Sequence, residues 1–311
     1  MNKREAKKVL YDVLGHSIAS GSETLYKCPV CQHHKFKLSI NFDKNAFKCW
    51  VCDYRGRSIR RIVRRFGNYI HLQRWDATVG RIELERFLDF FEEPTNEAPL
   101  AIDLPAGFKT LTSRHKPATA MYAYRYLRNR GISDEDILRW KMGYCFDGVY
   151  RNRIIIPSFN ENGQVNYFIA RSYSGDYYKY KNPKASKNVI FNELSVDWES
   201  DLVLVEGVFD AVVAGNAVPI LGSTMRSDSK LLQMIVMNDT PVYVALDSDA
   251  IEKENRIIQM LLSYDIELYK VNTSGYEDVG AMPKEIFLQR KKEATFIDGE
   301  DYLLLNLLSA M

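Results

Sequence analysis

The chain has 311 residues, of which 46% are hydrophobic and 26% charged, and this balance excludes a protein that is disordered throughout. Its length suggests about two domains, with room for a small extra module. No run approaches the roughly 18 to 20 apolar residues that cross a bilayer, and no apolar stretch follows the basic N-terminus as it would in a signal peptide. Five cysteines are too few for a secreted disulfide scaffold of this size, so we expect a reducing cytoplasm.

The net charge of +2 is unevenly distributed. Residues 1–70 carry fifteen Lys and Arg against five Asp and Glu, and residues 119–196 carry twelve against seven. Residues 197–311 reverse the balance, with nine against twenty. This order favours phosphate-binding modules followed by a carboxylate-rich module, although chance segregation onto solvated surfaces would give the same totals.

Apolar periodicity divides the first part of the chain. It predicts a helix in the first fifteen residues, short strands over 25–52, a basic helical stretch at 57–65 and more helix at 70–91. Residues 92–118 hold four of the ten prolines and little periodicity, which favours a linker. From residue 119 onward, strand-like and helix-like segments alternate. We therefore predict four segments, with these boundaries: 1–68, 69–118, 119–196 and 197–311.

Four of the five cysteines form two C-x2-C pairs, separated by seventeen residues: Cys28, Cys31, Cys49 and Cys52. Each pair can form a tight turn that points two sulfurs at one point, and two such turns supply the four-thiolate shell that zinc prefers. The alternatives are a redox pair or unliganded thiols. Four cysteines close the shell, so we expect one structural zinc, with His33 and His34 at the surface. Cys145 has no partner in spacing and is expected to be a small buried apolar residue.

Lysines and aromatic residues surround the cysteine pairs. This combination suits a single nucleic-acid strand, because cations hold phosphates and rings stack on bases. The alternative is that the rings form the core of a small domain. The residues concerned are Lys27, Lys35, Lys37, Lys44, Lys48, Phe36, Phe42, Phe47 and Trp50.

Acidic residues end two apolar runs in the last third of the chain. Glu206 follows the run 202–205, and Asp247 and Asp249 follow the run 241–246. With a helix expected over 208–217, a short strand and turn over 219–223, a helix over 250–263 and a last strand over 266–271, the pattern is that of a doubly wound α/β layer.

The carboxyl ends of parallel strands meet at one edge of such a layer. There the three acids repel one another unless a cation joins them, and oxygen ligands select Mg²⁺ or Mn²⁺. One acid at a strand end commonly caps a helix, but three in matched contexts favour a metal site for one or two ions. Asp278, after the last strand, is a further candidate ligand.

The acidic motifs resemble the toprim fold, in which Glu-Gly ends one strand and Asp-x-Asp another. Together with the cysteine pairs, the middle of the chain resembles bacterial and bacteriophage DNA primases. The matching segments are Tyr126–Ser133, Trp140–Tyr144, Arg153–Pro157, Asn162–Val165, Ile169–Arg171 and Lys179–Pro183. The resemblance implies a multidomain fold: a small β zinc ribbon, a linker, a basic α+β subdomain and an α/β toprim domain.

This sequence departs from the family pattern in several places. The first metal pair is Cys28 and Cys31, where the family often has Cys-x2-His. Ser248 replaces a glycine between the two aspartates, and residues 167–171 replace a glycine-rich segment. The flanks of Asp278 also differ. After the toprim segment only about 30 residues remain, fewer than the family's helicase-binding domain would need.

The resemblance implies an enzyme of DNA replication, a DNA-directed RNA polymerase that makes short RNA primers on a single-stranded DNA template. Glu206, Asp247 and Asp249 would be catalytic and, with Asp278, hold Mg²⁺; Glu206 could instead accept the 3′-hydroxyl proton. By motif match, template or nucleotide would be held by Arg153, Arg171, Lys179 and Asn182, and the zinc ribbon would read the template through Lys37, Lys48 and Trp50. Solvent-facing positions explain Arg151, Lys181 and Lys184 equally well.

The implied partners are single-stranded DNA, ribonucleoside triphosphates and a separate replicative helicase, in a bacterial cytoplasm and with the small size of a phage-encoded protein. No phosphate-binding loop of the G-x-x-x-x-G-K-[ST] type is present, which excludes a fused helicase. Two alternatives remain. One is a toprim nuclease or topoisomerase fragment, and the other is a non-catalytic zinc-ribbon DNA-binding protein.

Overall fold

We describe the protein from a computed structural model that gives residues 3–79 except 53 and 57, 101–221, 225–226, 229–297 except 265, and residue 302. The chain forms two compact units, Met1–Glu93 and Pro94–Met311. Each unit contains its own buried apolar core. The chain is therefore multidomain, as the sequence predicts.

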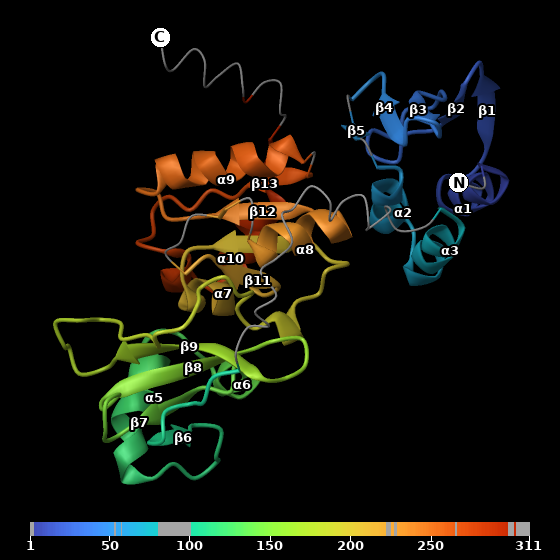
Figure 1. Ribbon diagram of the computed structural model, residues 1–311. Coiled ribbons are helices and arrows are strands. Elements are labelled where there is room, and N and C mark those ends of the chain that lie inside the picture. The colour runs from blue at the N-terminus through green and yellow to red at the C-terminus, as the bar shows by residue number, and fades with distance from the viewer. Residues whose placement is uncertain are drawn as a thin grey trace. The chain divides into compact units, whose positions relative to one another are not determined.

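The first unit packs helices against a five-stranded antiparallel sheet (Figure 1). The strands follow chain order, with each strand pairing with the next: β1 (Ser17–Ser20), β2 (Glu23–Tyr26), β3 (Leu38–Asn41), β4 (Ala46–Cys49) and β5 (Arg55–Gly56). The short strands predicted over 25–52 are confirmed as β2, β3 and β4.

The described residues of this unit also form the helices α1 (Lys3–Leu14), α2 (Arg60–Phe66) and α3 (Tyr69–Val79). The first ends as predicted at Gly15, whose φ of 80° is a conformation that glycine adopts without strain. The apolar faces of the helices share one core with the strands, including Leu10, Leu38, Ile62 and Trp75. The remainder of the predicted helix at 70–91, and residues 92–100 of the predicted linker, lie outside the described residues.

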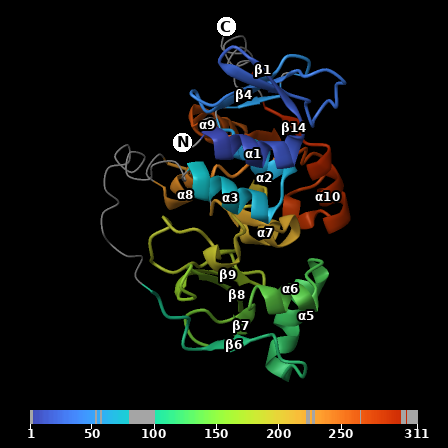
Figure 2. The same ribbon diagram turned by 90° about the vertical axis from the view of Figure 1, so that its right-hand side faces the viewer.

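The second unit begins with a four-stranded antiparallel sheet. Figure 2 shows its strands in the order β6 (Phe108–Thr110), β7 (Gly143–Cys145), β8 (Arg153–Phe159) and β9 (Val165–Ser172), with α5 (Met121–Asn129) and α6 (Asp134–Arg139) beside them. Strand β6 falls in the range interpreted as linker. It could not be recognised from the sequence, because only three of its residues pair with β7. Leu111, next to this strand, is fully buried.

The rest of the second unit is a five-stranded sheet of the predicted α/β type. Its strand order is β11 (Ala217–Pro219), β10 (Leu202–Val205), β12 (Val242–Ala245), β13 (Leu268–Lys270) and β14 (Thr295–Phe296). The first four strands run parallel, and the short β14 is antiparallel to β13. All four residues of β10 are buried, as expected of a strand covered on both faces.

Helices cover both faces of this sheet. Figure 1 shows α9 (Ile251–Ser263) on one side and α7 (Val208–Ala214) and α10 (Lys284–Lys292) on the other, and α8 (Lys230–Asn238) joins β11 to β12. The helix predicted over 208–217 ends earlier, because Gly215 with a φ of 90° stops it, and the next strand accordingly begins at Ala217 rather than at Pro219.

The two sheets of the second unit share one core, which contains Trp140 and Phe191 from the first part and Val205, Phe209 and Phe287 from the second. Two further contacts connect the antiparallel and parallel parts of this unit. Lys284 of α10 forms an ion pair of 2.6 Å with Asp136 of α6, and the guanidinium of Arg130 lies 4.7 Å from the ring centre of Phe209. The carboxylate edge of the parallel sheet is thereby fixed relative to the basic antiparallel part.

Candidate active site

The four paired cysteines converge in the first unit. Cys49 ends β4, and turns after β2 and β4 bring the other three sulfurs to it. The four sulfurs all lie within 4.8 Å of one another, with Sγ–Sγ distances of 3.7 Å between Cys28 and Cys52 and 3.8 Å between Cys31 and Cys49. Backbone amides within each pair donate to Cys28 and Cys49, as tight turns of this kind predict.

These distances fit a metal shell. A tetrahedron with metal–sulfur bonds of about 2.3 Å has sulfur–sulfur edges of about 3.8 Å, whereas a disulfide holds its sulfurs about 2.0 Å apart. Burial raises the pKa of the Cys28 thiol to about 12, so this thiol would ionise at neutral pH only beside a cation. The geometry of the cluster therefore fits a four-coordinate metal ion and does not fit a disulfide.

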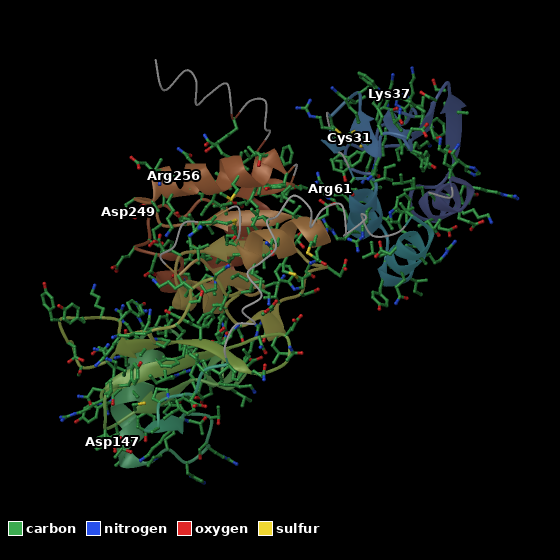
Figure 3. All side chains as sticks on the ribbon, in the orientation of Figure 1. Cys31, Lys37, Arg61, Asp147, Asp249 and Arg256 are labelled. Atoms are coloured by element: carbon green, nitrogen blue, oxygen red, sulfur yellow. The ribbon has the colours of Figure 1, made fainter. Side chains whose placement is uncertain are left out.

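The aromatic residues around the cysteines divide into two groups. Phe42 and Phe47 are buried and belong to the core, so for these two the alternative interpretation holds. Trp50 is 65% exposed, and the ammonium of Lys48 lies 5.2 Å from its ring centre. Lys37, labelled with Cys31 in Figure 3, precedes β3 on the same sheet. A cation and an exposed ring thus lie side by side next to the metal-binding turns.

Three of the predicted acids follow neighbouring parallel strands of the second unit. Val205 of β10 pairs with Ala245 of β12, so Glu206 and Asp247 leave the same edge of the sheet one and two residues later. Asp249 is exposed in the loop that leads into α9, where Figure 3 labels it. Asp278 lies before the short helix η3 (Val279–Ala281) and accepts a hydrogen bond of 2.7 Å from the amide of Ala281.

A fifth acid, Asp210, was not identified from the sequence. It lies in the first turn of α7 and is 5% exposed. Its carboxylate accepts hydrogen bonds from the amides of Gly207, at 2.7 Å, and Gly280, at 2.8 Å. A Cβ at Gly280 would lie only 2.9 Å from this carboxylate, so the close approach needs glycine. The available signal was the Glu-Gly-x-x-Asp spacing, which puts Asp210 one helical turn after Glu206.

The acids share one electrostatic environment. Burial and then the charges of Glu206, Asp278 and Asp249 raise the pKa of Asp247 to about 6. Burial also raises the pKa of Asp210 to about 7, against the hydrogen bonds that lower it, and Asp278 and Asp247 add to the rise. The acids therefore lie close enough for their charges to repel one another.

Two details of this edge point to a cation. Oδ1 of Asp247 is buried and accepts no hydrogen bond from any described residue, although a buried carboxylate oxygen normally has a partner. Lys253 of α9 places its ammonium 2.9 Å from Glu206 Oε1. One protein ammonium therefore offsets part of the negative charge, and the unpartnered oxygen of Asp247 is available to a further cation.

The carboxylate oxygens are less tightly gathered than the sulfurs. Among the His, Cys, Asp and Glu side chains of the described residues, only the four cysteines bring three or more ligand atoms within 4.8 Å of one another. The donor types at the acidic edge fit Mg²⁺ or Mn²⁺, but the oxygens would have to move closer to share one ion.

The predicted nucleotide-binding residues have different environments. Arg153 is 6% exposed, and its guanidinium donates to the carbonyls of Ala170, Tyr178 and Lys179, so its side chain is not available to a ligand. The Arg171 guanidinium donates to the Tyr126 hydroxyl at 3.0 Å.

The other two residues follow β9. The Lys179 side chain is exposed, and Oδ1 of Asn182 accepts a hydrogen bond from the Ala170 amide. Of the four predicted ligand-binding residues, Lys179 is thus the most open to a bound ligand.

No family model matches this sequence, and no curated protein matches it at a significant level. Solved structures do match. A DnaG primase catalytic domain bound to single-stranded DNA aligns over 63% of this chain and 78% of its own length, with a TM-score of 0.55 and 20% identity. The Escherichia coli primase catalytic core aligns over 63% and 79%, with a TM-score of 0.53 and 20% identity. A DNA primase domain from Pseudomonas aeruginosa aligns over 63% of this chain and 78% of its own length, with a TM-score of 0.51 and 17% identity.

These comparisons establish that the chain has the fold of a primase catalytic core. They agree with the resemblance found in the sequence, which rests on the acidic motifs and on the segments between residues 126 and 183. None of the described helices is both long enough and apolar enough to cross a bilayer.

Proposed function

We propose that this protein is a DNA primase, which synthesises short RNA primers on single-stranded DNA. The observation that carries the proposal is the acidic edge of the parallel sheet. Glu206 and Asp247 leave adjacent strands, burial and then the charges of the neighbouring acids raise the pKa of Asp247, and one of its oxygens is buried without a hydrogen-bond partner among the described residues. The primase fold and the basic antiparallel sheet next to this edge support the same conclusion.

The proposed reaction is nucleotidyl transfer. The 3′-oxygen of a ribose attacks the α-phosphorus of an incoming ribonucleoside triphosphate, the new bond is O3′–P, and the bond from that phosphorus to the leaving pyrophosphate breaks. Glu206, Asp247 and Asp249 would hold one or two Mg²⁺ or Mn²⁺ ions, with Asp278 as a further ligand. Such ions supply charge neutralisation for the phosphates. Asp210 would fix the Glu206 turn through its two backbone hydrogen bonds.

Cations outside the acidic edge would bind the phosphates. Lys179 is exposed and Arg171 is half-buried beside Tyr126, so both can face a triphosphate or a template phosphate. Asn182 would position this segment through its hydrogen bond to Ala170. We remove Arg153 from the ligand-binding set, because its guanidinium already binds backbone carbonyls within the fold.

The first unit, which contains the four paired cysteines, would bind the template. We infer that its metal is one structural zinc, since four thiolates close a tetrahedral shell and leave no open position for catalysis. Lys37, Lys48 and Trp50 would contact the DNA strand. The predicted segments 1–68, 69–118, 119–196 and 197–311 would correspond to the template-binding domain, the connecting segment, the basic subdomain and the toprim domain. A separate replicative helicase in a bacterial or phage-infected cell remains the proposed partner.

The proposal is tested by ribonucleotide incorporation on single-stranded DNA of mixed sequence with Mg²⁺. We expect the wild type to make short RNA and Asp247→Asn to lose the activity by about 100-fold or more. Asp147→Asn, at a surface position outside the acidic edge, is the matched control and should retain activity. Release of labelled DNA ends without RNA synthesis would favour the nuclease, and equal RNA synthesis by the wild type and Asp247→Asn would end the catalytic assignment.

A further inference from the structure

An exposed pair of tyrosines lies in the loop after β9. Tyr177 is 92% exposed, the highest value among the large hydrophobic side chains that the structure describes, and its neighbour Tyr178 is 72% exposed. Their ring centres are 5.0 Å apart and the rings are perpendicular. A single exposed aromatic residue is ordinary on a protein surface, but two adjacent rings on one loop present a continuous aromatic surface to solvent.

The loop that carries these rings is held firmly. Tyr180 pairs with Arg171 across the loop base, and the Ser172 amide donates to the Lys179 carbonyl at 2.9 Å. From inside, Arg153 donates to the carbonyls of Tyr178 and Lys179, at 3.1 and 3.3 Å. The buried arginine thus fixes the backbone from which the second ring projects.

The acid of the loop is also satisfied internally. Asp176 accepts hydrogen bonds from Ser172 and Ser174, at 3.0 and 3.1 Å, and lies 3.3 Å from the guanidinium of Arg153. Its charge is therefore balanced within the loop. Between residues 165 and 190 it is the one acid beside five cations, Arg171, Lys179, Lys181, Lys184 and Lys187. The two tyrosines therefore belong to a segment of net positive charge.

We propose that Tyr177 and Tyr178 form a stacking surface for the bases of a single nucleic-acid strand, with the neighbouring lysines on its phosphates. Rings among cations are the combination that sequence-tolerant single-strand binding uses, because every base has a π face. A protein partner would be favoured by apolar neighbours, whereas the two tyrosines are followed in the chain by Lys179, Lys181 and Lys184. In the proposed primase this strand is the template, so the inference rests on the proposed function for its biological meaning.

The rigid backbone matters for this role. Because the backbone at Tyr178 is already held, less conformational freedom of the chain is lost when a base stacks on its ring, so more of the stacking energy contributes to affinity. Base-aromatic stacking contributes about 1 to 3 kcal/mol per base, which corresponds to roughly fivefold to 150-fold in the dissociation constant.

The test compares two probes of equal length and charge, an oligothymidylate and the same backbone without bases, bound to the full-length protein. We expect the wild type to prefer the probe with bases, and Tyr177→Ala/Tyr178→Ala to lose about tenfold in affinity for that probe alone. Tyr177→Phe/Tyr178→Phe should bind within about twofold of the wild type, because phenylalanine keeps the π face. The slope of affinity against salt should stay unchanged, because the lysines are untouched.

Tyr122→Ala is the matched control, since this ring on α5 is also 72% exposed but lies outside the loop. Equal preference for bases in the wild type and the double alanine variant would overturn the inference, and so would an equal loss with Tyr122→Ala. Failure of the proposed function gives a different result, the absence of ribonucleotide incorporation by the wild type, whichever probe it prefers.

Discussion

At the scale of single residues, the carboxylates of the acidic edge differ in their partners. Glu206 is neutralised by Lys253, whereas Oδ1 of Asp247 has no hydrogen-bond partner among the described residues. The pair lies partly in solvent, with side-chain exposures of 19% for the lysine and 31% for the glutamate, so its own contribution to stability is small. Its main effect is on charge, because an ammonium at this position competes with a divalent cation for the same carboxylate.

Replacing Lys253 by Gln should therefore strengthen binding of a divalent cation. Removing one positive charge a few ångströms from a dication should lower the Mn²⁺ dissociation constant by roughly threefold to thirtyfold. Electron paramagnetic resonance of the zinc-loaded protein titrated with Mn²⁺ measures this directly. Arg256→Gln is the control, because Arg256 is paired with Glu252 in solvent on the same helix. Weaker Mn²⁺ binding by Lys253→Gln would mean that the lysine orients Glu206 for the metal instead of competing with it.

At the scale of elements, the cysteine turns and the strand ends were predictable because short patterns specify them. Two C-x2-C pairs define a metal shell whatever surrounds them, and an apolar run that ends in an acid defines a buried strand with its carboxylate at one edge. Strand β6 and Asp210 were not predicted, because the first depends on pairing with a distant strand and the second on the Gly280 amide, which lies 70 residues away in the chain. The carbonyls that bind the Arg153 guanidinium were not predicted either, because they belong to segments that no local pattern connects to it.

The first unit should depend on its metal. With a core built from short strands and helices, loss of the cysteine shell removes most of what holds the turns together. We expect Cys28→Ser to bind less than about a tenth of the zinc of the wild type and to make residues 1–93 sensitive to protease, while residues 94–311 stay resistant. Cys145→Ser is the control. That cysteine is fully buried in a separate apolar cluster of the second unit, so zinc content should be unchanged. Retained zinc and protease resistance in Cys28→Ser would exclude the four-cysteine shell.

At the scale of the whole molecule, the charge segregation of the sequence has a structural counterpart. The basic segments carry the cysteine unit and the antiparallel sheet, and the acidic segment carries the parallel sheet with its carboxylate edge. Without a divalent cation, the repulsion at that edge opposes folding of the second unit. Stability should therefore depend on pH and on the metal together.

The sign of this dependence follows from Asp247. Its pKa of about 6 in the folded chain lies above the ordinary value of 3.8, so the folded chain binds more protons in this interval, and the free energy of unfolding falls as the pH rises through it. In Mg²⁺-free buffer, Asp247→Asn should melt at a higher temperature than the wild type at pH 8, and the difference should be much smaller near pH 4. Melting curves of the zinc-loaded proteins at both pH values measure this. A difference that stays constant with pH would show that the aspartate is not destabilised in the fold.

The central claim is that carboxylates from separate strands bind the same divalent ions, and anomalous diffraction from crystals soaked in Mn²⁺ tests it most directly. We predict anomalous density bounded by Glu206, Asp247 and Asp249 in the wild type, and its loss in crystals of Asp247→Asn. Density confined to other surfaces, or unchanged density in Asp247→Asn, would contradict the account.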